Sequence, residues 1–177
     1  MKQSKKHSQK EYFEDGPILN HAVSVFLANE FDKLISTNFD QCARPPRIIF
    51  LELNLLHIFS RATNSYCTEE KTLTGSWIKL NNNSGMVNTS LPFNHEVVQS
   101  FCHWTLHFTN GELIVVDCQG NFDPIKDEYI LTDPAIHSRD SSRFGGTNLS
   151  TLGMKRFFDT HRCNQFCHKL ALTRPIF

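Results

Sequence analysis

Residues 111–120 read GELIVVDCQG, an apolar run that ends in an acid. The run from Leu113 to Val116 has the length and β-branched composition of a buried strand. Asp117 follows directly, so its carboxylate is held at the end of a rigid element, and Gln119 lies two residues further on. Carboxylate and amide oxygens suit Mg²⁺ binding and phosphoryl transfer. The alternative is that Asp117 only caps a turn.

The residues on either side of this run predict a hairpin and then a loop. Apolar side chains at positions 104, 106 and 108 alternate with polar ones, and positions 109–111 read Thr-Asn-Gly, so residues 101–117 are expected to form a β-hairpin. After Asp117 the chain is polar and is interrupted by Asp123-Pro124 and Asp133-Pro134, so we expect a loop up to Phe144. Asp133 offers a second carboxylate for Mg²⁺.

Other segments carry helix or strand patterns. From Ile18 to Leu34, apolar residues recur at steps of three and four, which predicts a helix that ends at Arg44-Pro45-Pro46-Arg47. Residues 48–56 predict a buried strand or a short helix, and residues 75–85 predict a short strand followed by an exposed polar loop. Ser150 and Asn164 are the expected N-caps of two further helices.

The segment HRCNQFC, residues 161–167, contains three soft metal ligands. Cys163 and Cys167 are four residues apart, so on a helix their sulfur atoms share one face, and His161 reaches the same point from the preceding turn. A structural zinc site has four nitrogen or sulfur ligands, and the fourth is open between His103 and His107. The alternative is a pair of buried core thiols beside a capping histidine.

A glycine-rich segment, FGGTNL at residues 144–149, precedes the first of these carboxyl-terminal helices. Such a segment can present backbone N–H groups to an anion or to the backbone of a substrate. It lacks the Lys and Ser or Thr of a P-loop and the glycine spacing of a dinucleotide site, so neither motif is present. The alternative is a flexible turn at a helix start.

Composition excludes several classes of protein. The chain has 177 residues, 40% of them hydrophobic, which is expected to give one globular domain. Its 18 basic and 18 acidic residues cancel, so charge gives no argument for a nucleic-acid partner. We find no signal sequence, and the most apolar window, residues 48–59, is shorter than the roughly 20 residues of a membrane span. Six cysteines are too few for a disulfide scaffold, so we expect a cytoplasmic protein that binds metal.

Several strings, taken in order, resemble those of the alpha-kinase family, the atypical protein kinases that include myosin heavy-chain kinase, elongation-factor-2 kinase and the channel-linked kinases. These strings are EKTLTG at 70–75, KLNNN at 79–83, HWT at 103–105, GELIVVDCQG at 111–120, LTDPAIHS at 131–138, FGGTNL at 144–149 and FFDTHRCNQFC at 157–167. The resemblance covers residues 18–172, and the chain is identified as a member of the family on their shared order.

The resemblance implies an α+β fold, mainly the carboxyl-terminal lobe of an alpha-kinase domain with a structural zinc site. It also implies a serine/threonine protein kinase that transfers the γ-phosphate of ATP to a protein. The implied zinc ligands are His103, His161, Cys163 and Cys167, which selects His103 over His107.

The resemblance also assigns residues to the reaction. It implies catalytic roles for Asp117 and Asp133. The residues expected around ATP and Mg²⁺ are Glu70, whose backbone would meet adenine, Lys79, Gln119, Thr132 and Asp133. For Lys79, a solvated surface lysine is the alternative. The residues expected in the loop that accepts the substrate peptide are Gly145, Gly146 and Asn148.

The family pattern also divides the chain into residues 1–17, a basic polar tail, residues 18–172, the kinase domain, and residues 173–177, a short tail. The family places strands, a glycine-rich cover and a phosphate-binding lysine ahead of the helix, and we expect residues 1–17 to supply none of them. Ser150 stands where the family usually has glycine. The alternatives to an active kinase are therefore a pseudokinase, a truncated zinc-stabilised binding or scaffold module, or a metal-binding regulatory domain without nucleotide.

Overall fold

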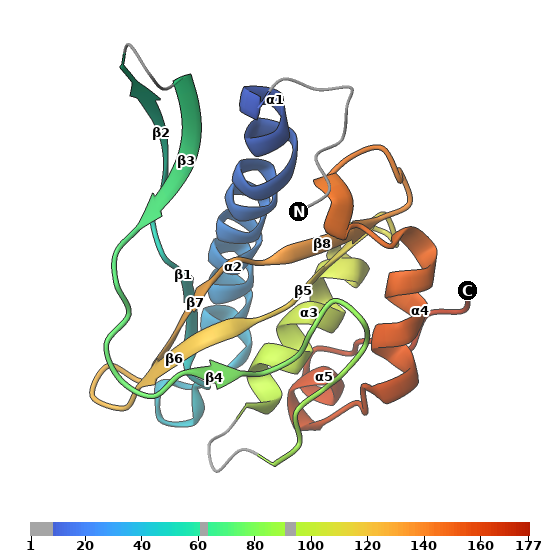
Figure 1. The fold of residues 1–177 in the computed structure, drawn as a ribbon. Helices are drawn as coiled ribbons and strands as arrows, with labels where there is room; N and C mark the ends of the chain where they lie inside the picture. The colour runs from blue at the N-terminus through green and yellow to red at the C-terminus, as the bar shows by residue number, and fades with distance from the viewer. Residues whose placement is uncertain (1–8, 61–63, 91–94) are drawn as a thin grey trace.

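The computed structural model describes residues 9–60, 64–90 and 95–177. It begins with a helical run of three parts, α1 (Gln9–Phe13), the π-helical turn η1 (Glu14–Ile18) and α2 (Leu19–Asn38) (Figure 1). The predicted helix is confirmed, but the helical run begins at Gln9, so residues 9–17, which we assigned to a tail, are helical. Residues 1–8 of that tail lie outside the described residues. A π-helical turn tolerates Pro17, which has no backbone N–H to donate.

The strands form one sheet of four strands and two smaller pairs. In the larger sheet the order is β1 (Arg47–Phe50), β7 (Glu128–Thr132), β6 (Gln119–Asp123) and β4 (Ile78–Lys79). β1 and β7 are parallel, and the other neighbours are antiparallel. β5 (Leu113–Val116) pairs with β8 (Ala135–Ser138). β2 (Leu53–Phe59) and β3 (Asn64–Glu70) form a hairpin that extends beside α1 (Figure 1).

Helix α3 (Glu96–Phe108) occupies the segment where we expected the first strand of a hairpin, and that prediction is wrong. Every residue from Val97 to Leu106 is buried, so this helix has no exposed polar face from which the sequence could reveal it. Its polar side chains find internal partners. Ser100 Oγ donates to Asn164 Oδ1 at 2.7 Å, and the Thr105 hydroxyl accepts a hydrogen bond from the Val115 amide at 3.0 Å. Of the predicted hairpin, the turn at 109–111 and the strand at 113–116 are present.

The polar region after Asp117 is also not the loop that we expected, because it contains β6, β7 and β8. Polar residues in this region, such as Asn121, are buried within the sheet. The segment 75–85 contains the predicted short strand, β4, but its loop is not fully exposed, since Asn81 is completely buried. Residues 48–50 belong to β1 and residues 53–56 to β2, which excludes the alternative of a short helix.

The two carboxyl-terminal helices, α4 (Ser150–Thr160) and α5 (Gln165–Lys169), are confirmed. Asn164 caps α5 as predicted, since its Oδ1 accepts from the amides of Phe166 and Cys167 at 2.9 and 3.2 Å. Ser150 is not the N-cap of α4, because its side chain makes no capping bond and its φ is 53°. Instead, Asn148 Oδ1 accepts from the Ser150 amide at 2.7 Å.

Helices α2, α3 and α4 pack against the strands. α2 packs against β1 and α3, and the ring of Phe31 lies 5.5 Å from that of Phe101 and 5.2 Å from that of Trp104. The β5–β8 pair contacts α3 through β5 and α4 through both strands. The ends of β5 and β7 are therefore anchored in the core, and the residues that follow them occupy defined positions.

Candidate active site

Asp117 and Asp133 lie at the two corners where the chain crosses between its sheets. Asp117 connects β5 to β6, and Asp133 connects β7 to β8. Both residues have a left-handed backbone, with φ of 62° and 47°, a conformation that Asp tolerates better than most residues. Because Gln119 pairs with Thr132 in the β6–β7 ladder, the two corners lie next to each other. The structure thus brings together the two acids to which we assigned catalytic roles.

Lys79 joins these acids from β4. Its partner in the strand register is Gln119 on β6. Its Nζ atom donates hydrogen bonds to Asp117 Oδ1 and to Gln119 Oε1, the latter at 2.7 Å. The alternative of a solvated surface lysine does not fit, because the ammonium group has two fixed partners and the side chain is 34% exposed.

Glu70, the last residue of β3, completes an acidic group. Thr132 Oγ1 donates to Glu70 Oε2, and Gln119 Nε2 donates to the Asp133 carbonyl at 3.4 Å. Asp133 is an exposed residue overall, but partial loss of water around its carboxylate raises its pKa. The negative charges of Asp117 and Glu70 raise this pKa further, and the positive charge of Lys79 lowers it. Since two negative charges act on Asp133 and one ammonium group opposes them, this group of oxygen donors suits a divalent cation.

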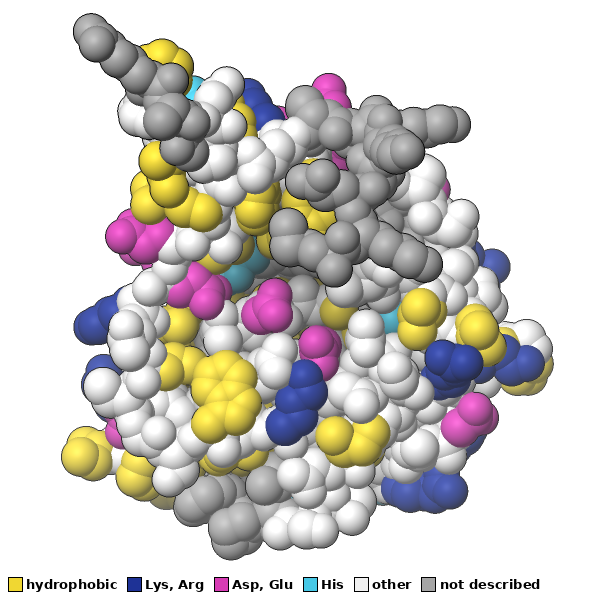
Figure 2. Space-filling model, in the orientation of Figure 1, with side chains coloured by type: hydrophobic (Ala, Val, Ile, Leu, Met, Phe, Trp, Pro, Cys, Tyr) yellow, Lys and Arg dark blue, Asp and Glu magenta, His cyan; other side chains and the backbone are white. Residues whose placement is uncertain are grey.

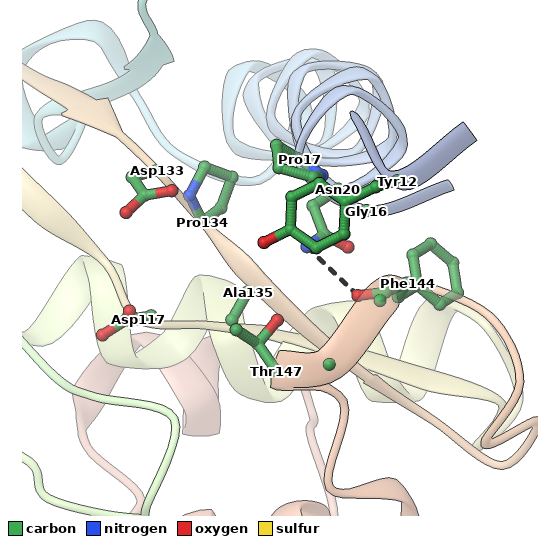
Figure 3. Close-up of a pocket in the computed structure, with 12 residues that line it drawn as sticks. Tyr12, Gly16, Pro17, Asn20, Asp117, Asp133, Pro134, Ala135, Phe144 and Thr147 are labelled. Atoms are coloured by element: carbon green, nitrogen blue, oxygen red, sulfur yellow. Dashed lines mark hydrogen bonds between the residues drawn. The ribbon is translucent and has the colours of Figure 1, made fainter. Parts of the chain in front are cut away.

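The acids border two neighbouring cavities. The first, of about 260 Å³, has Asp117 and Asp133 on one side and the helical residues Tyr12, Pro17 and Asn20 on the other (Figure 3). The second, of about 370 Å³, shares Pro17 and Asp133 with the first and extends to Glu70. Figure 2 shows acidic side chains around the hollow on this face of the molecule. Together the cavities reach the size of ligand pockets, which hold roughly 300–1,000 Å³.

The glycine-rich turn η3 (Gly145–Thr147) borders the first cavity (Figure 3). Gly145 has a φ of 70°, and a Cβ atom there would lie 3.0 Å from Cα of Gly16, so glycine allows the loop and η1 to approach closely. Gly146 has open space around it, with nothing within 4 Å of the position of a Cβ. Both glycines line the cavity.

Asn148, the third residue predicted for the peptide loop, has its side chain engaged within the protein. Its Oδ1 accepts from the amides of Ser138 and Ser150, and its Nδ2 donates to the carbonyls of Asp140 and Arg143 at 3.0 Å each. These bonds satisfy the whole amide group. Asn148 therefore holds the shape of the loop, and it does not line either cavity.

The four residues expected to bind zinc form a separate cluster. His103 comes from α3, His161 from the end of α4, Cys163 from the following turn and Cys167 from α5, and their ligand atoms lie within 4.8 Å of one another. Cys163 Sγ is 3.8 Å from His103 Nδ1, and Cys167 Sγ is 3.7 Å from His161 Nε2. Tetrahedral zinc with ordinary bond lengths separates such sulfur and nitrogen ligands by about 3.6 Å.

The surroundings of this cluster fit a metal. His103 Nε2 lies 3.0 Å from the Thr173 carbonyl, an arrangement that leaves Nδ1 free toward the cluster. Burial, followed by the nearby His103, lowers the pKa of His161 to about 3, so its ring is neutral, as metal ligation requires. His107, the other option for the fourth ligand, is exposed. Because His103 lies on α3 and not on the strand that we predicted there, the cluster joins three helices.

Sequence reasoning missed two residues that support the site. Asn81 Oδ1 accepts from the Cys118 amide at 3.0 Å and so fixes the corner that carries Asp117. Asn20 Nδ2 donates to the Phe144 carbonyl at 3.4 Å (Figure 3). The signal for Asn20 was available, since positions 12, 16 and 20 share a helical face once the helix is extended to Gln9. Asn81 read only as part of a polar turn.

Comparison with known proteins shows the family to which the chain belongs. The model of the alpha-kinase family matches residues 1–167. The chain belongs to the alpha-kinase family. Alpha-protein kinase vwkA of Dictyostelium discoideum is 36% identical over 184 residues, covering 100% of this chain and 28% of that protein. Eukaryotic elongation factor 2 kinase of Mus musculus is 32% identical over 142 residues, covering 80% of this chain and 18% of that protein.

Solved structures show the same relationship for this alpha-kinase chain. The alpha-kinase domain of myosin heavy chain kinase A in complex with AMP matches with a TM-score of 0.76 and 30% identity, covering 98% of this chain and 64% of that one. The same domain, as an inactive form in complex with ATP, matches with a TM-score of 0.76 and 28% identity. The chain therefore spans a minor part of its curated relatives and less than two thirds of the solved domain.

One further property follows from the helices. Within the described ranges, none of them combines the length and the apolar character that crossing a membrane requires.

Proposed function

We propose that this alpha-kinase chain forms the catalytic centre of a protein serine/threonine kinase, which transfers the γ-phosphate of ATP to a protein hydroxyl. The observation that carries the proposal is the contact of Lys79 with Asp117 and Gln119 at the edge of a cavity. The glycine-rich turn Gly145–Thr147 borders the same cavity. Solved structures of the related myosin heavy chain kinase A domain in complex with AMP and ATP support a nucleotide as the ligand.

In this proposal ATP occupies the cavity that Glu70, Thr132 and Asp133 line, with adenine at the backbone of Glu70. Oxygen atoms of Gln119 and Asp133 would hold Mg²⁺, which prefers such ligands. Bound Mg²⁺ would neutralise charge on the phosphates. The raised pKa of Asp133 fits this role, because crowded negative charge is relieved when a cation binds.

Asp117 would act at the reacting groups. The transfer breaks the bond between the γ-phosphorus and the bridging oxygen of ATP, which leaves ADP, and it forms a bond from phosphorus to the substrate oxygen. Asp117 assists at the γ-phosphate or accepts the hydroxyl proton. Lys79 holds one oxygen of the Asp117 carboxylate, and its positive charge lies beside the site where phosphate charge develops.

We also propose a structural zinc ion bound by His103, His161, Cys163 and Cys167. Four buried or half-buried nitrogen and sulfur donors at the observed spacing support it. The ion would tie α3 to the carboxyl-terminal helices. Since α3 packs against β5, the ion would also stabilise the strand that precedes Asp117.

The test compares binding and transfer in three forms of the chain. Titration calorimetry measures ATP binding in the presence of Mg²⁺, and labelled phosphate transfer is measured on an array of Ser and Thr peptides. Asp117→Ala should transfer phosphate at least roughly 100-fold more slowly, as expected for loss of a general base. Asp159→Ala, an exposed acid on α4, is the matched control and should behave as the wild type.

The outcomes separate the alternatives. Transfer by Asp117→Ala at the wild-type rate would contradict the role of Asp117. ATP binding without any transfer by the wild type would favour the pseudokinase. A folded, zinc-containing chain that binds no ATP would contradict the proposal as a whole and favour a binding or regulatory module.

A further inference from the structure

His137 on β8 is completely buried and makes two hydrogen bonds in opposite directions. Its Nε2 lies 2.8 Å from the Asn83 carbonyl, and the Leu149 amide donates to its Nδ1 at 3.0 Å. A carbonyl only accepts and an amide N–H only donates, so the ring is neutral with its hydrogen on Nε2. Burial lowers the pKa of His137 and keeps the ring in this form, although the bond to Asn83 opposes the shift.

The two partners of His137 belong to two segments that adjoin residues of the proposed active site. Asn83 belongs to the segment that follows Lys79 at the end of β4. Leu149 directly follows Asn148, the last residue of the proposed peptide loop, and precedes α4. One imidazole ring thus connects the segment that carries the nucleotide-side lysine to the end of the loop on the substrate side.

Helix α4 packs against the ring of His137 and limits its movement. Gly153 packs so closely that a Cβ atom there would lie 2.3 Å from His137 Cδ2 and 2.5 Å from Cγ and Nε2. Here the ring has one orientation, and that orientation meets both segments.

We infer that His137 is a positioning residue, which anchors the end of the peptide loop Gly145–Asn148 to β8 through the bond to Leu149. This inference rests on the proposed kinase function. Its consequence is specific: the bond to Leu149 governs how well the peptide binds, while the bond to Asn83 does not. Binding of ATP should depend on neither bond.

Two substitutions separate the two bonds. In His137→Asn, the side-chain oxygen is as many bonds from Cα as Nδ1 is, so it can accept from Leu149, while the contact with Asn83 is lost. In His137→Gln, the side-chain nitrogen is as many bonds from Cα as Nε2 is, so it can donate to Asn83, while the contact with Leu149 is lost. Each variant loses one bond, so the two should lose similar thermal stability.

Steady-state kinetics should then distinguish the variants. The probe is a synthetic peptide selected from a Ser and Thr peptide array by the wild-type chain. His137→Gln should raise the KM for this peptide roughly two- to tenfold, the effect of one hydrogen bond, with an unchanged KM for ATP. His137→Asn should have a KM for the peptide close to that of the wild type. Equal peptide KM values in the two variants would overturn the inference, because a purely structural role affects both alike.

A second measurement does not depend on activity. Hydrogen exchange of the amides at 145–150 should accelerate in His137→Gln, again roughly two- to tenfold, and remain near the wild-type rate in His137→Asn. If the wild type transfers no phosphate, the proposed function fails, and the exchange rates still decide whether His137 holds the loop. Equal exchange in both variants would overturn the inference.

Discussion

Replacing Gly153 by alanine should destabilise this protein, although the same change inside a helix is usually stabilising. Gly153 lies in the first turn of α4. Alanine is favoured over glycine in a helix interior by about 1 kcal/mol. At this position, however, the added Cβ atom would lie 2.3 Å from a ring carbon of His137, far closer than two carbon atoms can approach.

The cost follows from what the ring can do. His137 is completely buried, and the carbonyl of Asn83 and the amide of Leu149 bind its two nitrogen atoms, so it cannot move aside freely. Overpacking of this kind costs about 1–3 kcal/mol, and loss of one of the hydrogen bonds costs about 1 kcal/mol more. After the gain in helix propensity, the net loss is about 2 kcal/mol, which lowers Tm by roughly 4–8 °C in a chain of this size.

Thermal and urea denaturation of Gly153→Ala test this expectation. Gly146→Ala is the matched control, because nothing lies within 4 Å of the added atom and its stability should change by less than about 0.5 kcal/mol. If Gly153→Ala were as stable as the wild type or more stable, the ring of His137 would not be held as tightly as its contacts indicate.

Three further expectations concern the metal cluster, the loop and acid. Cys167→Ser should abolish stoichiometric zinc in elemental analysis and lower Tm by more than 5 °C, roughly the effect of 2 kcal/mol, whereas the exposed Cys42→Ser should do neither. Ser150→Gly should raise the free energy of unfolding by about 0.5–1 kcal/mol in urea denaturation, because a φ of 53° strains a non-glycine residue; an unchanged value would contradict this. The pKa of His161 is lowered from 6.5 to about 3, so between these values the unfolded chain binds a proton at this residue and the folded chain does not. The free energy of unfolding of the metal-free protein should therefore fall by about 2 kcal/mol between pH 6.5 and pH 5. Urea denaturation at several pH values that gives the same free energy throughout would refute this.

The fold was predictable where one face of an element is exposed. In helix α2 the buried residues recur at helical spacing with exposed residues between them, so its period is visible in the sequence. Asn164 caps α5 in the expected way. Helix α3 was misread because it is buried on all sides. The polar residues His103 and Thr105 read as the outward face of a strand, yet each is satisfied inside the protein. Such satisfaction depends on distant partners and leaves no local pattern.

Some residues of the site were also predictable from the sequence, and others were not. Asp117 follows a strand end, Gln119 lies two residues on, and Asp133 begins an Asp-Pro break, so their short strings identify them. The hydrogen bonds of Asp117 and Gln119 to Lys79 agree with those strings. His137 lies in the string LTDPAIHS, but nothing in that string indicates its role. Its importance arises from a carbonyl and an amide in segments far from it in sequence, and those contacts exist only once β8 lies between them.

The parallel pairing of β1 with β7 also bears on the order in which the chain folds. Arg47 and Glu128 are register partners 81 residues apart, and the intervening segment carries Glu70, Lys79 and Asp117. Closing a loop of that length costs about 4 kcal/mol of chain entropy before the strands can pair. On a ribosome, β1 emerges with its apolar Ile48 and Phe50 and remains without its neighbour until β7 has been synthesised. The sheet and the catalytic corners must therefore assemble late and together, and the first half of the chain is the part that needs protection from aggregation during synthesis.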